Sequence, residues 1–182
     1  MNVSRRLGSV TIALVIAAGM TLAVSPHAAA TAAAKAPAPC SGPLHKQFDF
    51  WAGRWRVTDR ATGKFDGTNE VTRELNGCVL QEHWSGSGGS HGSSFNLYDA
   101  SRKVWHQTWV DNGGGILQLD GGLHDRSMIL SGTRHAASGK PVIDRITWTP
   151  QRDGSVRQWW QTSNDGGRTW KTAFDGIYRR SV

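Results

Sequence analysis

Turn-forming residues interrupt this chain at regular intervals, and that regularity constrains the fold more than any other feature. Glycine-bearing or polar breaks recur about every 12 or 13 residues, near Gly63, Gly77, Gly88, Ser101, Gly114, Asp125, Gly139, Gly154 and Gly166. The segments between them are rich in Val, Ile, Thr, Phe and Trp and show no helical period. Short even spacing leaves no room for crossover connections, and closing a meander removes its bare edges. The sequence therefore predicts an all-β, antiparallel up-and-down barrel of about ten strands.

An aromatic stretch from Phe48 to Val57 precedes the first predicted strand. Within it, Gly53-x-Trp55 lets the backbone approach closely and then places a large indole where the strand enters the barrel. Gly-x-Trp resembles the stretch with which lipocalin-like barrels close one end, often beneath an arginine from a late strand; the resemblance implies a plug here, with Arg179 or Arg180 stacking on the indole. A short helical turn around His45 to Phe50 is expected before it; the alternative is a Trp that only fills the core.

The N-terminal region has the features of a targeting segment. Residues 1–30 combine basic Arg5 and Arg6, an uncharged apolar run and small residues at Ala28 to Ala30, which predict a cleaved signal peptide. Residues 31–43 predict a disordered Ala/Pro-rich linker, and residues 44–182 a single β-barrel domain. We therefore expect an exported protein, periplasmic or secreted, that does not span a membrane after signal removal.

The formal net charge is +7, or +5 once Arg5 and Arg6 are removed with the signal peptide. The basic residues are scattered along the predicted strands rather than clustered, and no nucleic-acid-binding motif is present. We expect no nucleic-acid partner; the oligomeric state is not predicted.

The chain contains two cysteines, Cys40 and Cys78. An even count in an exported chain favours a disulfide, and two cysteines allow one pairing. The alternative is two free buried thiols.

Several motifs resemble the conserved stretches of a bacterial exported family of unknown function that opens with the pattern FDFWxGxW. They are Phe48–Trp55, Gly77–Trp84, Ser94–Asp99, Trp105–Asp111, Asp144–Trp148, Ser163–Trp170 and Phe174–Tyr178. The resemblance implies a calycin-like barrel, related in shape to lipocalins and fatty-acid-binding proteins. It implies no reaction, since the family has none established.

Three local patterns suggest chemistry, and each has a plainer interpretation. Ser163 to Trp170 resembles the Asp-box of sialidases, but a single copy favours a hairpin stabiliser. Gly88 to Gly92 matches the nucleophile elbow G-x-S-x-G but lies in a Gly/Ser-rich break, which favours a hairpin tip. Nitrobindin-like barrels bind haem through a histidine near the C-terminus, and this chain has none after His135. No cofactor or metal site is predicted.

The predicted site is the interior of the barrel, because several strands place a Trp and a polar residue at alternate positions and so on one face. Indoles beside buried polar groups favour a cavity that binds a small, partly apolar ligand. The predicted ligand-binding residues are Glu82, Trp84, Asn96, Tyr98, Gln107, Trp109, Arg145, Gln158 and Trp160. We expect a binding protein rather than an enzyme. The alternatives are an enzyme using Glu82 with Arg145, and a structural envelope protein with a filled barrel.

Overall fold

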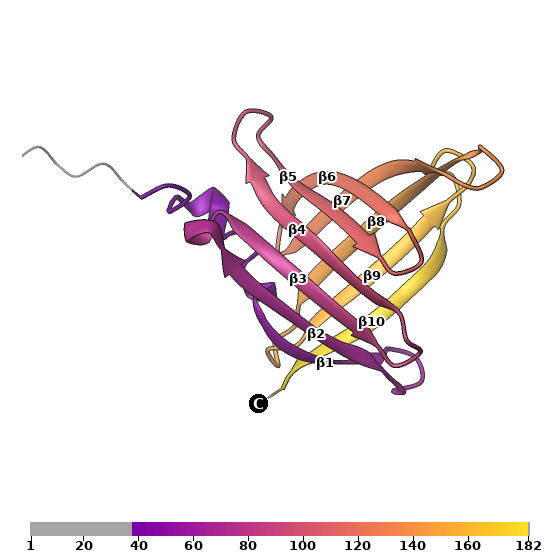
Figure 1. Cartoon of the computed structure of the whole chain (residues 1–182), viewed down its shortest axis with the longest axis horizontal. Helices are drawn as coiled ribbons and strands as arrows, with labels where there is room; N and C mark the ends of the chain where they lie inside the picture. Colours follow the sequence, from indigo (N-terminus) through magenta and orange to yellow (C-terminus); the bar gives the residue numbers. More distant parts are fainter. Residues whose placement is uncertain (1–37, 182) are drawn as a thin grey trace, which may run out of the picture. The chain divides into compact units, whose positions relative to one another are not determined.

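The computed structural model describes residues 38–181. The predicted signal peptide and most of the predicted linker lie outside these residues. Within them, ten antiparallel strands close into a single barrel in which neighbours in sequence are neighbours in space, and β1 pairs with β10 (Figure 1). The strands are β1 (Gly53–Asp59), β2 (Phe65–Glu74), β3 (Val79–Gly86), β4 (His91–Asp99), β5 (Val104–Asp111), β6 (Ile116–His124), β7 (Ser127–His135), β8 (Pro141–Pro150), β9 (Val156–Ser163) and β10 (Lys171–Arg180).

The predicted all-β up-and-down barrel is confirmed, as is the short helical segment before the first strand. That segment consists of two 3-10 turns, η1 (Pro43–Lys46) and η2 (Asp49–Trp51), and a third, η3 (Leu75–Gly77), links β2 to β3. Among the described residues, no helix is long and apolar enough to cross a membrane.

Aromatic side chains from η2 and from the residue before it plug one end of the barrel. Phe48 and Trp51 are fully buried; their rings stack on each other and both contact Trp148 of β8. The guanidinium of Arg180 lies 4.5 Å from the centre of the Trp55 ring and donates to the carbonyl of Ala52. Gly53 has a φ of 141°, a backbone conformation that L side chains rarely adopt, which explains the glycine. The expected Gly-x-Trp plug with an arginine lid is present.

A disulfide and an arginine hold the plug segment. Cys40 and Cys78 form the expected disulfide, which joins the chain before η1 to the end of η3. Arg73 of β2 forms an ion pair with Asp49 and donates to the carbonyl oxygens of His45 and Gly77. The N-terminal segment is therefore fixed to the β2–β3 connection by covalent and polar contacts.

The hairpin of residues 164–170 shows what the Asp-box pattern does. The Asp165 carboxylate accepts from the backbone N–H groups of Arg168 and Thr169, and the Trp170 indole donates to the carbonyl of Gly167. On the outer face of the barrel, the Arg145 guanidinium stacks on the Trp170 ring, 3.9 Å from its centre. The motif stabilises a hairpin, as interpreted from the sequence.

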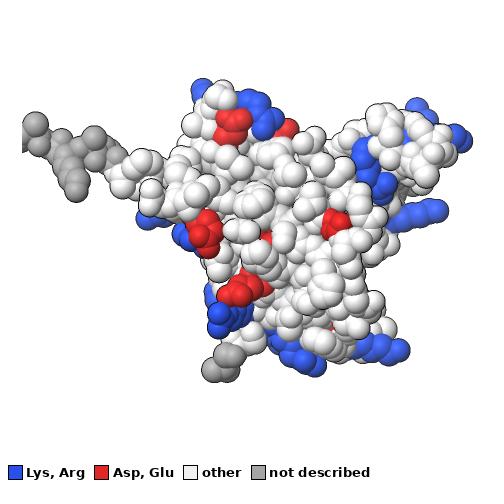
Figure 2. All heavy atoms as spheres, viewed as in Figure 1, with Lys and Arg blue, Asp and Glu red and all other residues white. Residues whose placement is uncertain are grey.

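On the face of the molecule shown in Figure 2, lysines and arginines lie in separate groups. Figure 2 shows them at the edges of the face in view and on the projecting hairpins, while uncharged residues occupy much of the centre.

Candidate functional site: a cavity at the open end

The end of the barrel opposite the plug is hollow. A cavity of about 430 Å³ lies there, lined by residues of β3, β4, β5, β6, β8, β9 and β10. Its aromatic lining consists of Trp84, Trp109, Trp160, Phe174 and Tyr178, and its apolar lining also includes Leu117 and Ile146. Pockets of this size and character are typical of small-molecule sites.

Eight of the nine predicted site residues point into the barrel. Six line the cavity: Glu82, Trp84, Gln107, Trp109, Gln158 and Trp160. Asn96 is fully buried and bonds to Gln107 below the cavity. Tyr98 lies near the plug, where its ring contacts His45 and Trp105. The alternation of side chains along the strands thus brings six of these residues together and leaves two deeper in the interior.

The prediction that Arg145 points into the barrel is wrong, because this residue lies on the outer face of β8. Its inward-facing neighbours are Asp144 and Ile146, both buried. Arg145 instead donates to Gln161 at 2.9 Å and stacks on Trp170. It cannot act in the lumen beside Glu82, as the alternative enzyme hypothesis requires, since the two side chains lie on opposite faces of the barrel wall. The catalytic hypothesis that paired Glu82 with Arg145 is wrong in that form.

Glu82 is the centre of a buried polar network beneath the cavity. Its two carboxylate oxygens accept from Asn69 Nδ2 at 2.9 Å and Ser94 Oγ at 2.7 Å. Asn96 donates to Ser94, and Gln107 donates to Asn96 at 2.7 Å. These contacts fix the orientation of four polar side chains without a counter-charge for the carboxylate.

Burial raises the pKa of Glu82 to about 7, although the hydrogen bonds from Ser94 and Asn69 act in the opposite direction. Desolvation disfavours the charged form more than two neutral donors favour it. The same burial, with the nearby Glu82 carboxylate, raises the pKa of Tyr178 well above its usual range. Glu82 is therefore poised to gain or lose a proton near neutral pH.

Glycines in the same or the neighbouring strand lie against three aromatic rings of the cavity. A Cβ at Gly92 of β4 would lie inside the ring of Trp109 on β5. In the same way, a Cβ at Gly67 of β2 would come within 2.8 Å of the Trp84 ring, and one at Gly176 within 2.5 Å of the Phe174 ring. Three cavity aromatics thus lie against backbone that carries no side chain, which gives each ring a defined position.

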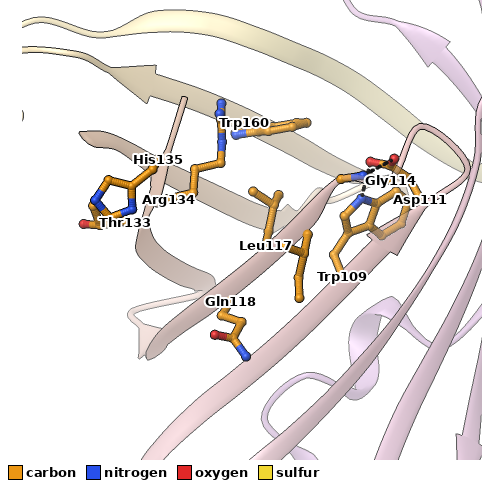
Figure 3. Close-up of a pocket in the computed structure, with 11 residues that line it drawn as sticks. Trp109, Asp111, Gly114, Leu117, Gln118, Thr133, Arg134, His135 and Trp160 are labelled. Atoms are coloured by element: carbon orange, nitrogen blue, oxygen red, sulfur yellow. Dashed lines mark hydrogen bonds between the residues drawn. The ribbon is translucent and has the colours of Figure 1, made fainter. Parts of the chain in front are cut away.

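A slot in the barrel wall adjoins the cavity. The ladder between β6 and β7 runs from His124↔Ser127 to Asp120↔Ser131, and beyond it the strands separate toward the open end. The slot, of about 520 Å³, shares Trp109, Leu117 and Trp160 with the cavity. In Figure 3, Leu117 lies between Trp109 on one side and Arg134 and Trp160 on the other. The lumen therefore has a lateral opening as well as a mouth.

Arg134 and Asp144 form an ion pair beside the slot. Asp144 is fully buried; it accepts from the Trp160 indole at 2.8 Å and lies 2.8 Å from Arg134 Nε. Neither residue was predicted, although Asp144 shares the parity of Ile146 and Trp148, which was the available signal. Phe174 and Tyr178 of β10 also line the cavity and were not predicted, although they alternate regularly on one face of the strand after the bulge between Thr172 and Phe174.

Two alternative chemistries receive no structural support. Ser90 of the G-x-S-x-G pattern lies in the hairpin between β3 and β4, not between a strand and a helix, and its hydroxyl accepts from Trp84. Among residues 38–181, no group of three His, Cys, Asp or Glu side chains is arranged to hold a metal ion.

The fold and the cavity together define a class of protein: a closed antiparallel barrel of calycin-like shape with an aromatic pocket at one end. No protein-family model matches the sequence, and neither does any curated protein.

Proposed function

We propose that this barrel binds a small, partly apolar molecule in its lumen. The observation that carries the proposal is the cavity of about 430 Å³, with rings of Trp, Phe and Tyr on its walls and Glu82, Gln107 and Gln158 among its polar groups. Aromatic walls supply most of the binding energy in such sites, and a few polar groups fix orientation. A barrel filled by its own side chains would have no such space.

The test is a ligand panel of aromatic metabolites, amines and lipids, followed by intrinsic tryptophan fluorescence and thermal shift. The matched variants are Trp84→Leu, which removes a ring from the cavity, and Trp159→Leu, which removes one from the outer face. Trp159 contacts Arg157 and Thr172 on the outside of the barrel. Binding that weakens at least tenfold in Trp84→Leu and is unchanged in Trp159→Leu supports the proposal. A flat response across the panel contradicts it.

We also propose that the protein is exported, in keeping with the family that its motifs resemble. The disulfide between Cys40 and Cys78 supports this, since such bonds persist in oxidising compartments. The intact mass of the protein recovered from its native cells tests it. Cleavage after residue 30 is the expected result, and a chain that retains Met1 contradicts the proposal.

A further inference from the structure

The indole N–H groups around the cavity are already engaged. Trp84 donates to Ser90, Trp109 to Asp111 and Trp160 to Asp144, at 3.2, 3.2 and 2.8 Å. An indole has no other hydrogen-bonding group. The three tryptophans therefore present only carbon surface and π-electrons to a ligand.

The polar side chains at the floor of the cavity also use their hydrogen-bond donors within the protein. The amides and hydroxyl beneath it donate to one another and to Glu82, through Asn69, Ser94, Asn96 and Gln107. In contrast, Gln158 also lines the cavity, and its buried Oε1 accepts no hydrogen bond from residues 38–181. A buried acceptor without a donor is costly, so the negative end of this amide dipole favours positive charge nearby.

The charged lining of the cavity is acidic, in a chain whose formal net charge is +7. The carboxylates that line it are Glu82 and Asp111, and neither Lys nor Arg appears among the lining residues. The Gly115 N–H, the Trp109 indole and the Gly113 N–H lower the pKa of Asp111, which keeps it ionised. Arg134 lines the neighbouring slot and is paired with Asp144.

We propose that the ligand of this cavity is a cation, an organic ammonium compound with an aromatic or aliphatic body. This inference rests on the proposed function and narrows it. The faces of Trp84, Trp109 and Trp160 would hold the cationic group by cation–π attraction, strongest for indoles. Glu82 and Asp111 complement the charge, whereas an anionic ligand would meet two carboxylates and no cation.

Proton release accompanies binding in this arrangement. A cation near Glu82 favours its ionised form and lowers its pKa from about 7. The other titratable groups around the cavity are Tyr178 across the floor, and His91 and Asp111 near the mouth. The affinity for a permanently charged ligand therefore increases as the pH rises toward 7 and levels off above it.

Three probes that share a benzyl group separate charge from shape. They are benzyltrimethylammonium, its carbon isostere neopentylbenzene, and the anion phenylacetate, and their binding is measured by calorimetry and tryptophan fluorescence at pH 8. The cation is expected to bind at least tenfold more tightly than the isostere, and the anion more weakly than both. An isostere that binds as tightly as the cation, or an anion that binds best, overturns this inference and leaves binding in the lumen intact.

Variants that remove one negative charge test whether the Glu82 carboxylate recognises the cation. Glu82→Gln is expected to reduce the preference for the cation over its isostere at least fivefold and to remove the pH dependence of affinity below 7. Glu70→Gln is the control, since Glu70 pairs with Arg54 on the outer face of β2. If Glu82→Gln does not fold, Trp109→Leu tests the cation–π contact and is expected to weaken the cation more than the isostere.

If these variants weaken the binding of the cation and of its isostere equally, the inference is contradicted. If none of the three benzyl probes binds but other compounds of the ligand panel do, the preference for a cation is overturned and binding in the lumen stands. Silence in both experiments overturns the proposed function as well.

Discussion

At the scale of single residues, Glu82 is the most consequential side chain. It is 4% exposed, with hydrogen bonds to both oxygens and no cationic partner. Natural proteins rarely bury a carboxylate in this way without a counter-charge, because desolvation is expensive. The chain tolerates it here beneath a hollow space, where a bound molecule can supply the missing partner.

Glu82 makes the stability of the free protein depend on pH. Because its pKa rises from 4.5 in the unfolded chain to about 7 in the folded state, the folded protein binds more protons between these values. The free energy of unfolding is therefore expected to fall by about 3 kcal/mol as the pH rises from 4.5 to 7, and to level off above 7. Urea denaturation across this range measures it. In the matched variant Glu82→Gln, the decrease in the free energy of unfolding should be smaller by about that amount. Identical pH profiles for the variant and the wild type would refute the raised pKa of Glu82.

At the scale of strands, the contact between rings and glycines determines how the walls of the cavity pack. We expect Gly92→Ala to displace the Trp109 ring and to cost about 1–3 kcal/mol, the usual range for overpacking. Chemical denaturation measures the cost, and a shift of the tryptophan emission reports the ring. Gly122→Ala in β6 is the control, since a Cβ there meets nothing within 4 Å. Equal effects of the two substitutions would show that the ring contact is unimportant.

The strands also show how far the sequence could predict this site. Turn spacing was sufficient for ten strands, and alternation was sufficient for eight inward-facing residues, since β3, β4, β5 and β9 keep one parity on the inward face where these residues lie. The prediction for Arg145 was wrong because β8 places Asp144 on the inward face, where Arg134 of the neighbouring strand β7 pairs with its charge. That pairing depends on which residues lie opposite each other across β7 and β8, and one strand's sequence does not contain it.

The lateral slot was not predictable for a similar reason. It exists because the β6–β7 ladder stops at Asp120↔Ser131, although both strands continue. A Cβ at Gly132 would collide with the Gln118 carbonyl, so the strands approach closely there and separate beyond it. Gly132 stands at that point, but an isolated glycine within a strand indicates a close backbone approach and does not by itself predict that a ladder ends.

At the scale of the whole molecule, the plug and the cavity occupy opposite ends of the barrel and should be energetically separable. Replacing both Cys40 and Cys78 with Ser opens a loop of 38 residues. The chain-entropy model predicts a loss of about 3–4 kcal/mol. Thermal or urea denaturation of the double variant, beside the wild type, measures the loss. Ligand affinity should be unchanged within twofold, and a large loss of affinity would show that the two ends are coupled.

The positions of the two described chain ends have a practical consequence. Ala38 leads into the disulfide beside the plug, and β10 ends at Arg180, which covers Trp55 at that same end. An affinity tag or surface linker attached at either position would emerge behind the plug and leave the opposite mouth facing solution. The protein is thus suited to oriented immobilisation on a sensor chip, where small molecules in the flow could reach its tryptophans unobstructed.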